Sequence, residues 1–383
     1  MLRNSLFQQL KLMTITFLVA FSASATVQAQ NAPTPSNTDN ASINEQSVKP
    51  ATTDEETSET VDPRENISNA INSGRSYVSL VFENDIFFKD DGGYTNGVGI
   101  AWGHGLFERF DKENTPWPLH LLVKHLPINT QEGRHRAISY LVGQMMSTPE
   151  DITKPAPEPG DAPYAGLLAG RVTFHSFNAV RTDRLTLVLG MVGPSSGAED
   201  AQSLVHDVTG SENPQGWDTQ IKDEPVFRVE RSRSDRYWDT AFDNGLEMDL
   251  VGTSVGGLGN LSSDIGYGLG LRFGQSLRDS FPTATNLPGR EINPTAGNRN
   301  QHWMIYMNLL GSYTFNNIMI EGNTFKDSYG AELVHEQLKF SFGAAYNIGK
   351  WAFSYTGALS SKQYEAQDDM GKFGSINVTY KLH

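Results

Sequence analysis

Oxygen-bearing side chains gather around one polar connection near the start of the patterned sequence. Asn84 and Asp85 follow a run, residues 78–83, whose apolar side chains alternate as in a strand. Tyr94-Thr95-Asn96 begin a second such run, which extends to Trp102. A hairpin would bring these side chains together, and carboxylate, amide and hydroxyl oxygens suit a hard cation such as calcium. The alternative is a solvated turn, because Asn, Asp and Gly dominate turns.

A second candidate site lies in the long insertion between Gly193 and Glu224. Ser195 or Ser196 can cap a short helix there. Gln202 and His206 are then spaced i and i+4, which places both on one face of that helix. A histidine in this position is a natural general base for hydrolysis, and the alternative is a structural histidine.

The elements that must position these residues are strands. From Tyr77 onward, segments of about ten residues alternate in polarity and are separated by Gly, Asn, Asp and Pro. We expect thirteen candidate strands, at 78–83, 94–102, 137–145, 165–177, 184–191, 225–233, 245–254, 262–273, 303–315, 318–325, 338–346, 351–359 and 372–382. The pattern predicts an all-β fold, and a soluble β-sandwich could show the same alternation. A secretory signal, the Gly, Tyr and Trp near strand ends and a strand at the carboxyl terminus favour an antiparallel transmembrane β-barrel of about 12 strands with a short helical insertion in an extracellular loop.

The strand count and the turns conflict. Single-chain bacterial barrels normally have an even number of strands, so one candidate is superfluous. The Asn316-Asn317 and Asn347–Lys350 connections resemble short periplasmic turns, and a hairpin turn is expected around Arg181-Thr182-Asp183. Counting hairpins back from the first two of these turns puts the Asp85–Gly93 loop on the wrong side of the membrane, so we expect one segment between Pro225 and Phe273 to be the superfluous strand.

Composition narrows the class and the address of the protein. Forty-four acidic against 30 basic residues give a formal charge of −14, which argues against a nucleic-acid partner. The chain has no cysteine, so neither disulfides nor thiolate metal sites are possible. Residues 1–29 read as a secretory signal peptide and 30–75 as a polar, disordered periplasmic leader, which leaves 76–383 for the barrel.

Several motifs occur together in one order. They are Glu83-Asn84-Asp85, Tyr94-Thr95-Asn96-Gly97, Gly143-Gln144, Thr148-Pro149-Glu150-Asp151, Pro163-Tyr164-Ala165-Gly166, Gly193-Pro194-Ser195-Ser196-Gly197, Gln202-x-x-x-His206 and Gly216-Trp217. This ordered set, which covers residues 77–231, resembles the outer-membrane lipid A 3′-O-deacylase family. The final residue, His383, departs from the aromatic ending common among outer-membrane barrels.

The resemblance implies a calcium-dependent hydrolase at the outer-leaflet end of a bacterial outer-membrane barrel, with lipid A of lipopolysaccharide as substrate and His206 as the base that activates water. The remaining site residues that it implies are Gln202, Thr95, Asn84 and Glu212 for catalysis, Asp85 and Asn84 for the metal, and one lysine among Lys112, Lys124 and Lys154. We expect the protein to be a monomer surrounded by membrane lipid.

Two other functions stay open at this stage. An outer-membrane phospholipase A would share the barrel, calcium and acyl-ester chemistry, but would use a serine nucleophile with histidine and asparagine. A porin-like barrel without enzymatic activity would need neither the helical insertion nor the cluster around Asn84.

Overall fold

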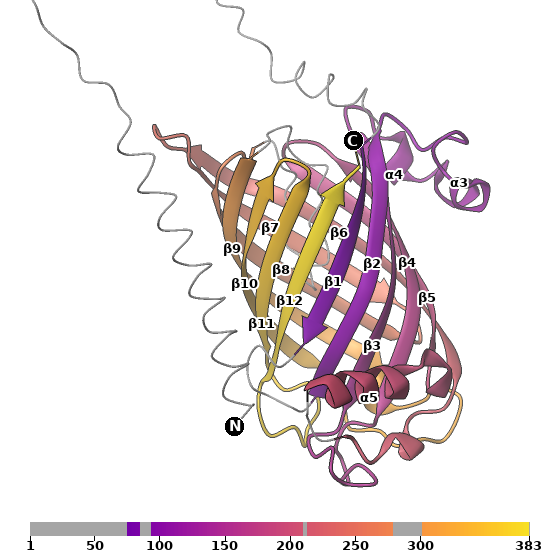
Figure 1. The fold of residues 1–383 in the computed structure, drawn as a ribbon. Coiled ribbons are helices and arrows are strands. Elements are labelled where there is room, and N and C mark those ends of the chain that lie inside the picture. The colour runs from indigo at the N-terminus through magenta and orange to yellow at the C-terminus, as the bar shows by residue number, and fades with distance from the viewer. Residues whose placement is uncertain (1–74, 85–92, 210–212, 279–300, 383) are drawn as a thin grey trace, which may run out of the picture. The chain divides into compact units, whose positions relative to one another are not determined.

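The computed structural model describes residues 75–84, 93–209, 213–278 and 301–382, with the backbone alone at 75, 93–96, 204–209 and 301. The expected signal peptide and leader lie outside these ranges. Twelve antiparallel strands form a closed barrel in which β1 pairs with β12 (Figure 1). The predicted fold class is therefore confirmed.

The strands are β1 Arg75–Asn84, β2 Gly93–Phe107, β3 His135–Thr148, β4 Ala165–Phe177, β5 Arg181–Val192, β6 Glu224–Ala241, β7 Glu247–Leu258, β8 Ser262–Gly274, β9 Gln301–Asn317, β10 Glu336–Ile348, β11 Trp351–Ser360 and β12 Gly371–Lys381. The helical segments are α3 Trp117–Val123, α4 Pro127–Thr130, η2 Pro194–Ser196, α5 Ala198–Thr209, η3 Trp217–Thr219 and α6 Ile318–Glu321. None of the helices in the described ranges is long and apolar enough to cross a bilayer.

The barrel wall has an apolar outer face and a polar inner face. On β1, Val78, Leu80 and Phe82 are exposed, whereas Ser79 and Val81 between them are buried. Successive side chains of a strand point to opposite faces, so the exposed series faces the membrane and the buried series faces the lumen. This alternation assigns every wall residue discussed below to one face.

Ion pairs fill part of the lumen. Asp249 on β7 accepts hydrogen bonds from Arg272 Nε at 2.8 Å and from Arg236 Nε at 3.0 Å. All three side chains are at most 3 % exposed. Charges this deeply buried are tolerated only when they are paired, because removing an ion from water costs several kcal/mol. The network therefore ties β6, β7 and β8 together on the lumen side of the wall.

The two ends of the barrel differ in their connections. One end carries the short turns Asn178–Val180, 242–246 and 349–350 together with the end of β12 and one long connection, 108–134. The other end carries β1's last residue, Asn84, and the long connection that contains α5 (Figure 1). Outer-membrane barrels have short periplasmic turns and longer extracellular loops, so the α5 end is the extracellular one.

The segment between β2 and β3 forms two helices that the sequence pattern did not predict. Phe110, Val123 and Ile128 from this segment pack with Phe174, which has the outward alternation of β4. Arg136 holds the segment in place by donating to the carbonyl oxygens of Glu108, Ile128 and Asn129 at 2.6–3.3 Å. Helices α3 and α4 therefore cover the outer wall at the periplasmic end.

One predicted strand, Ile318–Phe325, is wrong. Asn317 instead caps the short helix α6, because its side chain accepts a hydrogen bond from the Met319 N–H at 3.1 Å. Ile318 and Ile320 are both buried, so an apolar alternation that suggested a strand belongs to one helical turn. Gly322, with φ of +85°, ends that turn in a conformation that favours glycine.

Removing this strand resolves the conflict in the count. All three segments between Pro225 and Phe273 are strands (β6, β7 and β8), so the expectation of a superfluous strand there was wrong. The Asn316-Asn317 connection lies at the extracellular end, opposite Asn347–Lys350. The hairpin before β5 is confirmed, but its turn is Asn178–Val180, where Asn178 Oδ1 accepts from the Arg181 N–H at 2.9 Å.

The Asp249 network yields a stability prediction. Replacing Asp249 with Leu leaves two buried guanidinium groups without their carboxylate, which should destabilise the barrel by about 3–5 kcal/mol. We expect a lower temperature for loss of the compact, fast-migrating form on electrophoresis of unheated samples. Asp235→Asn is the control, since that carboxylate is 24 % exposed. Equal melting of the two variants would show that the lumen network does not stabilise the fold.

Candidate active site on the outer wall

Four strands place one residue each in a row on the outer side of the extracellular end. Asn84 pairs with Asn96, Asn96 with Met146, and Met146 with Gly166. Neighbouring strands are about 4.8 Å apart, so the row spans roughly 14 Å. Asn84 has the outward alternation of Phe82 but is only 9 % exposed, so other segments cover the wall here.

Helix α5 is docked at the far end of this row. A Cβ at Gly166 would lie well inside contact distance of Ser196 Oγ and Ala198 Cβ. Glycine is therefore the residue that lets η2 and α5 approach the wall so closely. The Gly193 N–H donates to Gly166 O at 3.0 Å, and Gln144 Nε2 donates to Ser196 O at 2.6 Å. Figure 1 shows α5 across the extracellular end of the barrel.

An aromatic cluster supports the same helix from the other side. Tyr164 and Trp217 are buried, with ring centroids 5.2 Å apart, and pack with Ala198 and Met146. Gly216 is again a close approach, because a Cβ there would meet the Tyr164 ring. Burial raises the pKa of Tyr164 to about 12, so its hydroxyl stays neutral. Four of the eight motifs that carried the family resemblance therefore hold α5 in place, namely Gly143-Gln144, Pro163–Gly166, Gly193–Gly197 and Gly216-Trp217.

Gln202 is the described side chain of α5 best placed for chemistry. It is 1 % exposed, and its Oε1 accepts a hydrogen bond from Trp217 Nε1 at 2.8 Å. An indole N–H can only donate, so this bond fixes which way the amide points. Gln202 Nε2 is left buried without a partner among the described residues. A buried unpaired donor costs free energy, which makes it a candidate for binding an acceptor on a ligand.

His206 lies one helical turn beyond Gln202 on the backbone of α5. Thr95 lies in the first residues of β2, directly before the Asn96 that pairs with Asn84. The structure describes only the backbone of these two residues. Asp85 and Glu212 lie outside the described residues, and their predicted roles stay predictions.

The structure separates the three lysine candidates. Lys112 and Lys124 lie between β2 and β3, at the periplasmic end. Lys154 lies between β3 and β4, at the end that carries α5, and its carbonyl oxygen lies against Gly216. Its Nζ pairs with Glu158 Oε1 at 2.5 Å, and this hydrogen bond raises the pKa of Lys154. Of the three candidates, Lys154 is thus the one at the end of the barrel that carries α5.

The serines before α5 do not cap it as predicted. The Ser195 hydroxyl donates to Asp223 Oδ2 at 2.7 Å and lowers the pKa of that carboxyl, while Ser196 Oγ is buried without a hydrogen-bond partner. Gly193–Gly197 does have the Gly-x-Ser-x-Gly spacing of serine hydrolases. The Ser195 hydroxyl, however, is bonded to the Asp223 carboxylate. This hydrogen bond anchors the loop to the start of β6.

Within the described ranges, no group of three His, Asp or Glu side chains is placed to hold a metal ion. The predicted metal ligand Asp85 lies outside those ranges. Glu83 does not contribute to the outer row, because alternation points it into the lumen. There it is fully buried and accepts a hydrogen bond from Ser375 Oγ at 3.3 Å.

A closed twelve-stranded barrel with an apolar outer face and a helix docked outside its wall defines an outer-membrane β-barrel protein with an external candidate site. The model of the family described as "Outer membrane protein LpxR" matches residues 20–382, so the chain belongs to that family. This confirms the outer-membrane location and the lipid A deacylase family that the motifs indicated. No curated protein sequence gives a significant match.

Solved structures support the fold. LpxR from Salmonella typhimurium is 17 % identical, with a TM-score of 0.66, over 79 % of this chain and 99 % of that one. The β domain of the Bordetella autotransporter BrkA is 9 % identical, with a TM-score of 0.38, over 80 % and 98 % of the two chains. The KdgM porin is 9 % identical, with a TM-score of 0.33, over 80 % and 99 %. Of these three, only the TM-score of 0.66 with the Salmonella protein indicates a shared fold.

Gly166 and Gly170 form a matched pair for testing the docking of α5. Both have the outward alternation of β4, but a Cβ at Gly170 meets only Leu189 O at 3.9 Å. We expect Gly166→Val to displace η2 and α5 and Gly170→Val to leave them in place. Limited proteolysis between Pro194 and Asp223 measures this in the folded barrel. Equal cleavage of both variants would contradict the docking contact.

Proposed function

We propose that this protein removes the 3′-linked acyloxyacyl chain of lipid A by calcium-dependent ester hydrolysis, with His206 as the base that activates water. The main support is the outer-wall row of Asn84, Asn96, Met146 and Gly166. It links the polar connection after β1 to the helix that carries His206. Sequence motifs far apart in the chain thus meet on one face of the barrel.

The site's position favours a membrane lipid as substrate. It lies outside the barrel wall at the extracellular end, next to the exposed apolar residues that face the outer leaflet, such as Phe82 and Val98. A lipid can therefore reach it by lateral movement within the membrane. The helix α5 docked on the outer wall argues against the porin alternative, because a barrel without enzymatic activity would not need that insertion.

Ester hydrolysis requires a base for the attacking water and donors for the developing oxyanion. In our proposal, His206 takes the proton of the water. Gln202 Nε2 can donate to a substrate oxygen because Trp217 fixes the orientation of its amide. Lys154, which Glu158 keeps protonated, adds positive charge on the same side and suits the lipid A phosphates better than the role of a base.

Calcium suits the remaining residues of the proposed site. Asn84 is buried and pairs with Asn96 at the start of β2, and Asp85 follows it in the sequence. Amide and carboxylate oxygens suit calcium, and the chain has no cysteine that could supply a thiolate. We propose that Asp85 and Asn84 hold the ion, with Thr95 beside it and Glu212 near the end of α5. When bound, calcium would polarise the ester carbonyl.

Calcium removal provides one test. We expect excess EGTA to abolish lipid A deacylation by the purified protein while the compact, heat-modifiable form persists, because the strand ladder does not depend on the ion. Adding calcium back should restore the activity. Calcium binding by isothermal titration should also weaken in Asp85→Asn. Full turnover in EGTA would show that the reaction needs no calcium.

The base is tested by His206→Ala and His206→Gln, with lipid A from cells producing each variant analysed by mass spectrometry. The wild-type protein should cause a mass loss equal to the 3′ acyloxyacyl group. Both variants should slow the reaction by roughly two to four powers of ten, because neither side chain accepts a proton at neutral pH.

Ser195→Ala is the matched control, because it removes a hydroxyl from the same loop without touching the proposed base. We expect it to remain active. Near wild-type turnover by His206→Gln would disprove the role of His206. Inactivity of Ser195→Ala, together with fatty acid released from glycerophospholipid, would identify the phospholipase alternative instead.

A further inference from the structure

The outer wall between β5 and β6 contains charged side chains where lipid-facing residues are expected. Leu187 and Leu189 on β5 and Phe227 and Val229 on β6 have the outward alternation of their strands. Leu189 is 70 % exposed, Phe227 49 % and Val229 45 %. The same outward series continues with Arg181 and Asp183 on β5 and with Arg231, Arg233 and Asp235 on β6.

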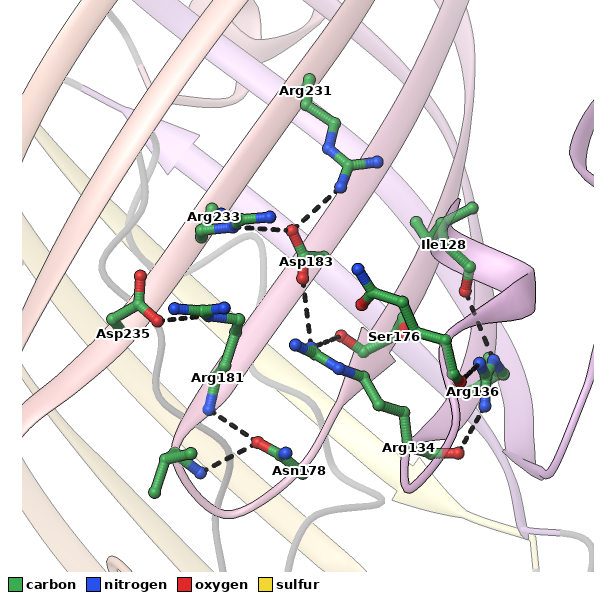
Figure 2. Close-up of polar contacts among 12 residues, drawn as sticks. Ile128, Arg134, Arg136, Ser176, Asn178, Arg181, Asp183, Arg231, Arg233 and Asp235 are labelled. Carbon is green, nitrogen blue, oxygen red and sulfur yellow. Dashed lines mark hydrogen bonds and ion pairs between the residues drawn. The ribbon is translucent and has the colours of Figure 1, made fainter. Parts of the chain in front are cut away.

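These charges form one connected cluster, shown in Figure 2. Asp183 lies at its centre and accepts from Arg231 Nη2 at 2.9 Å and Arg233 Nε at 3.0 Å. Arg134, which precedes β3, approaches the other oxygen of Asp183 at 3.1 Å. Arg181 pairs with Asp235 beside them. We call these six residues the outer arginine cluster.

The cluster has an excess of positive charge. Four guanidinium groups face two carboxylates, which leaves a net charge of +2 (4 − 2 = 2). Asp183 is fully buried, but the Arg231 and Arg233 side chains are 41 % and 42 % exposed. Each guanidinium has five N–H donors in a fixed fork, so both retain donors that can bind an anion.

The depth of the cluster makes this exposure costly. Arg231 and Arg233 are the eighth and tenth of the 18 residues of β6 (231 − 223 = 8 and 233 − 223 = 10). Val229 precedes them, and exposed Tyr237 and Trp238 follow, as at a periplasmic membrane interface. Excess arginine charge on the lipid face destabilises such barrels by an amount that depends on depth, and register places these two opposite Leu185 and Asp183, near the periplasmic turn before β5. A bound anion would compensate the two charges.

A groove of about 840 Å³ begins at the same two arginines and continues over β7, β8 and β9. The outward-facing residues Ser254, Gly256 and Gly311 have small side chains or none, so they form the floor of the groove. Ile265 and Tyr313 form part of its walls. A lipid-facing wall usually carries large apolar residues in such positions. The groove has the dimensions and the apolar character of a site for an acyl chain.

We propose that the outer arginine cluster and this groove bind one anionic glycerophospholipid of the periplasmic leaflet. Its phosphate contacts Arg231 and Arg233, and one acyl chain lies over Gly311. The charge of +2 selects an anion, and the apolar groove selects one that carries a chain. The cluster reaches Arg181 beside the periplasmic turn Asn178–Val180, so the headgroup enters from that leaflet.

Native mass spectrometry of the full-length mature protein tests this, with phosphatidylglycerol and phosphatidylcholine of equal chain length as probes. We expect one phosphatidylglycerol per chain, and phosphatidylcholine bound roughly tenfold more weakly. Arg231→Gln combined with Arg233→Gln should weaken phosphatidylglycerol binding by about tenfold. Equal binding of the two lipids to the wild-type protein would overturn the proposal.

Gly311→Leu tests the groove without disturbing the ion pairs. An added side chain at Gly311 meets open space, so the leucine should occupy the groove, leave the barrel folded and weaken phosphatidylglycerol binding several-fold. Gly170→Leu, also outward with an open Cβ position, is the matched control and should bind as the wild type does. Unchanged binding by Gly311→Leu, or a stable dimer that covers this face, would overturn the proposal.

Discussion

The approach of η2 and α5 to Gly166 is the constraint on which the candidate site depends. A helix of twelve residues is marginal in water on its own, so tertiary contacts must fix both its formation and its position. Glycine at 166 permits the contact, and the hydrogen bonds from Gly193 and Gln144 hold it. The barrel wall thereby supplies a rigid reference for a site that stands on a loop.

The inner and outer faces of the wall use the same ion-pair chemistry with different results. In the lumen, Asp249 lies between Arg236 and Arg272, and all three are enclosed by protein. On the outer face, Asp183 is enclosed just as fully, but Arg231 and Arg233 remain exposed beside it. The lumen network is therefore complete within the chain, whereas the outer one leaves donors for a ligand from the membrane.

Period-two alternation predicted the strands, because a strand with one face to lipid and one to the lumen must alternate, and the secretory signal and the aromatic residues near strand ends favoured a barrel over a soluble β-sandwich. It failed at Ile318–Phe325, where a capped helical turn buries Ile318 and Ile320 with the same spacing as a strand. It also missed α3 and α4, whose burial of Val123 and Ile128 depends on an outer-wall partner, Phe174, that local sequence does not reveal.

The sequence motifs predicted which residues gather around α5 better than they predicted what each residue does there. Gln202 was predicted as catalytic, and its buried, unpaired Nε2 is consistent with that role. Tyr164, Gly166 and Trp217 carried the family resemblance, yet the structure shows them packing against the segment that carries α5. The row from Asn84 to Gly166 was not predictable, because it depends on the register of four strands, which the turns and bulges between them set.

An external site also has an energetic consequence for the proposed reaction. Moving an acyl chain from lipid into water costs about 0.8 kcal/mol for each methylene, so a route through a polar lumen would oppose binding strongly. At the outer wall, the chains of a lipid substrate exchange one apolar surface for another, and only the polar groups near the ester must change partners. Binding energy from Gln202 and Lys154 can then act on the reacting ester and its phosphates rather than on extracting the chains. An external site therefore fits a lipid substrate better than a route through a lumen that holds the buried ion pairs of Asp249.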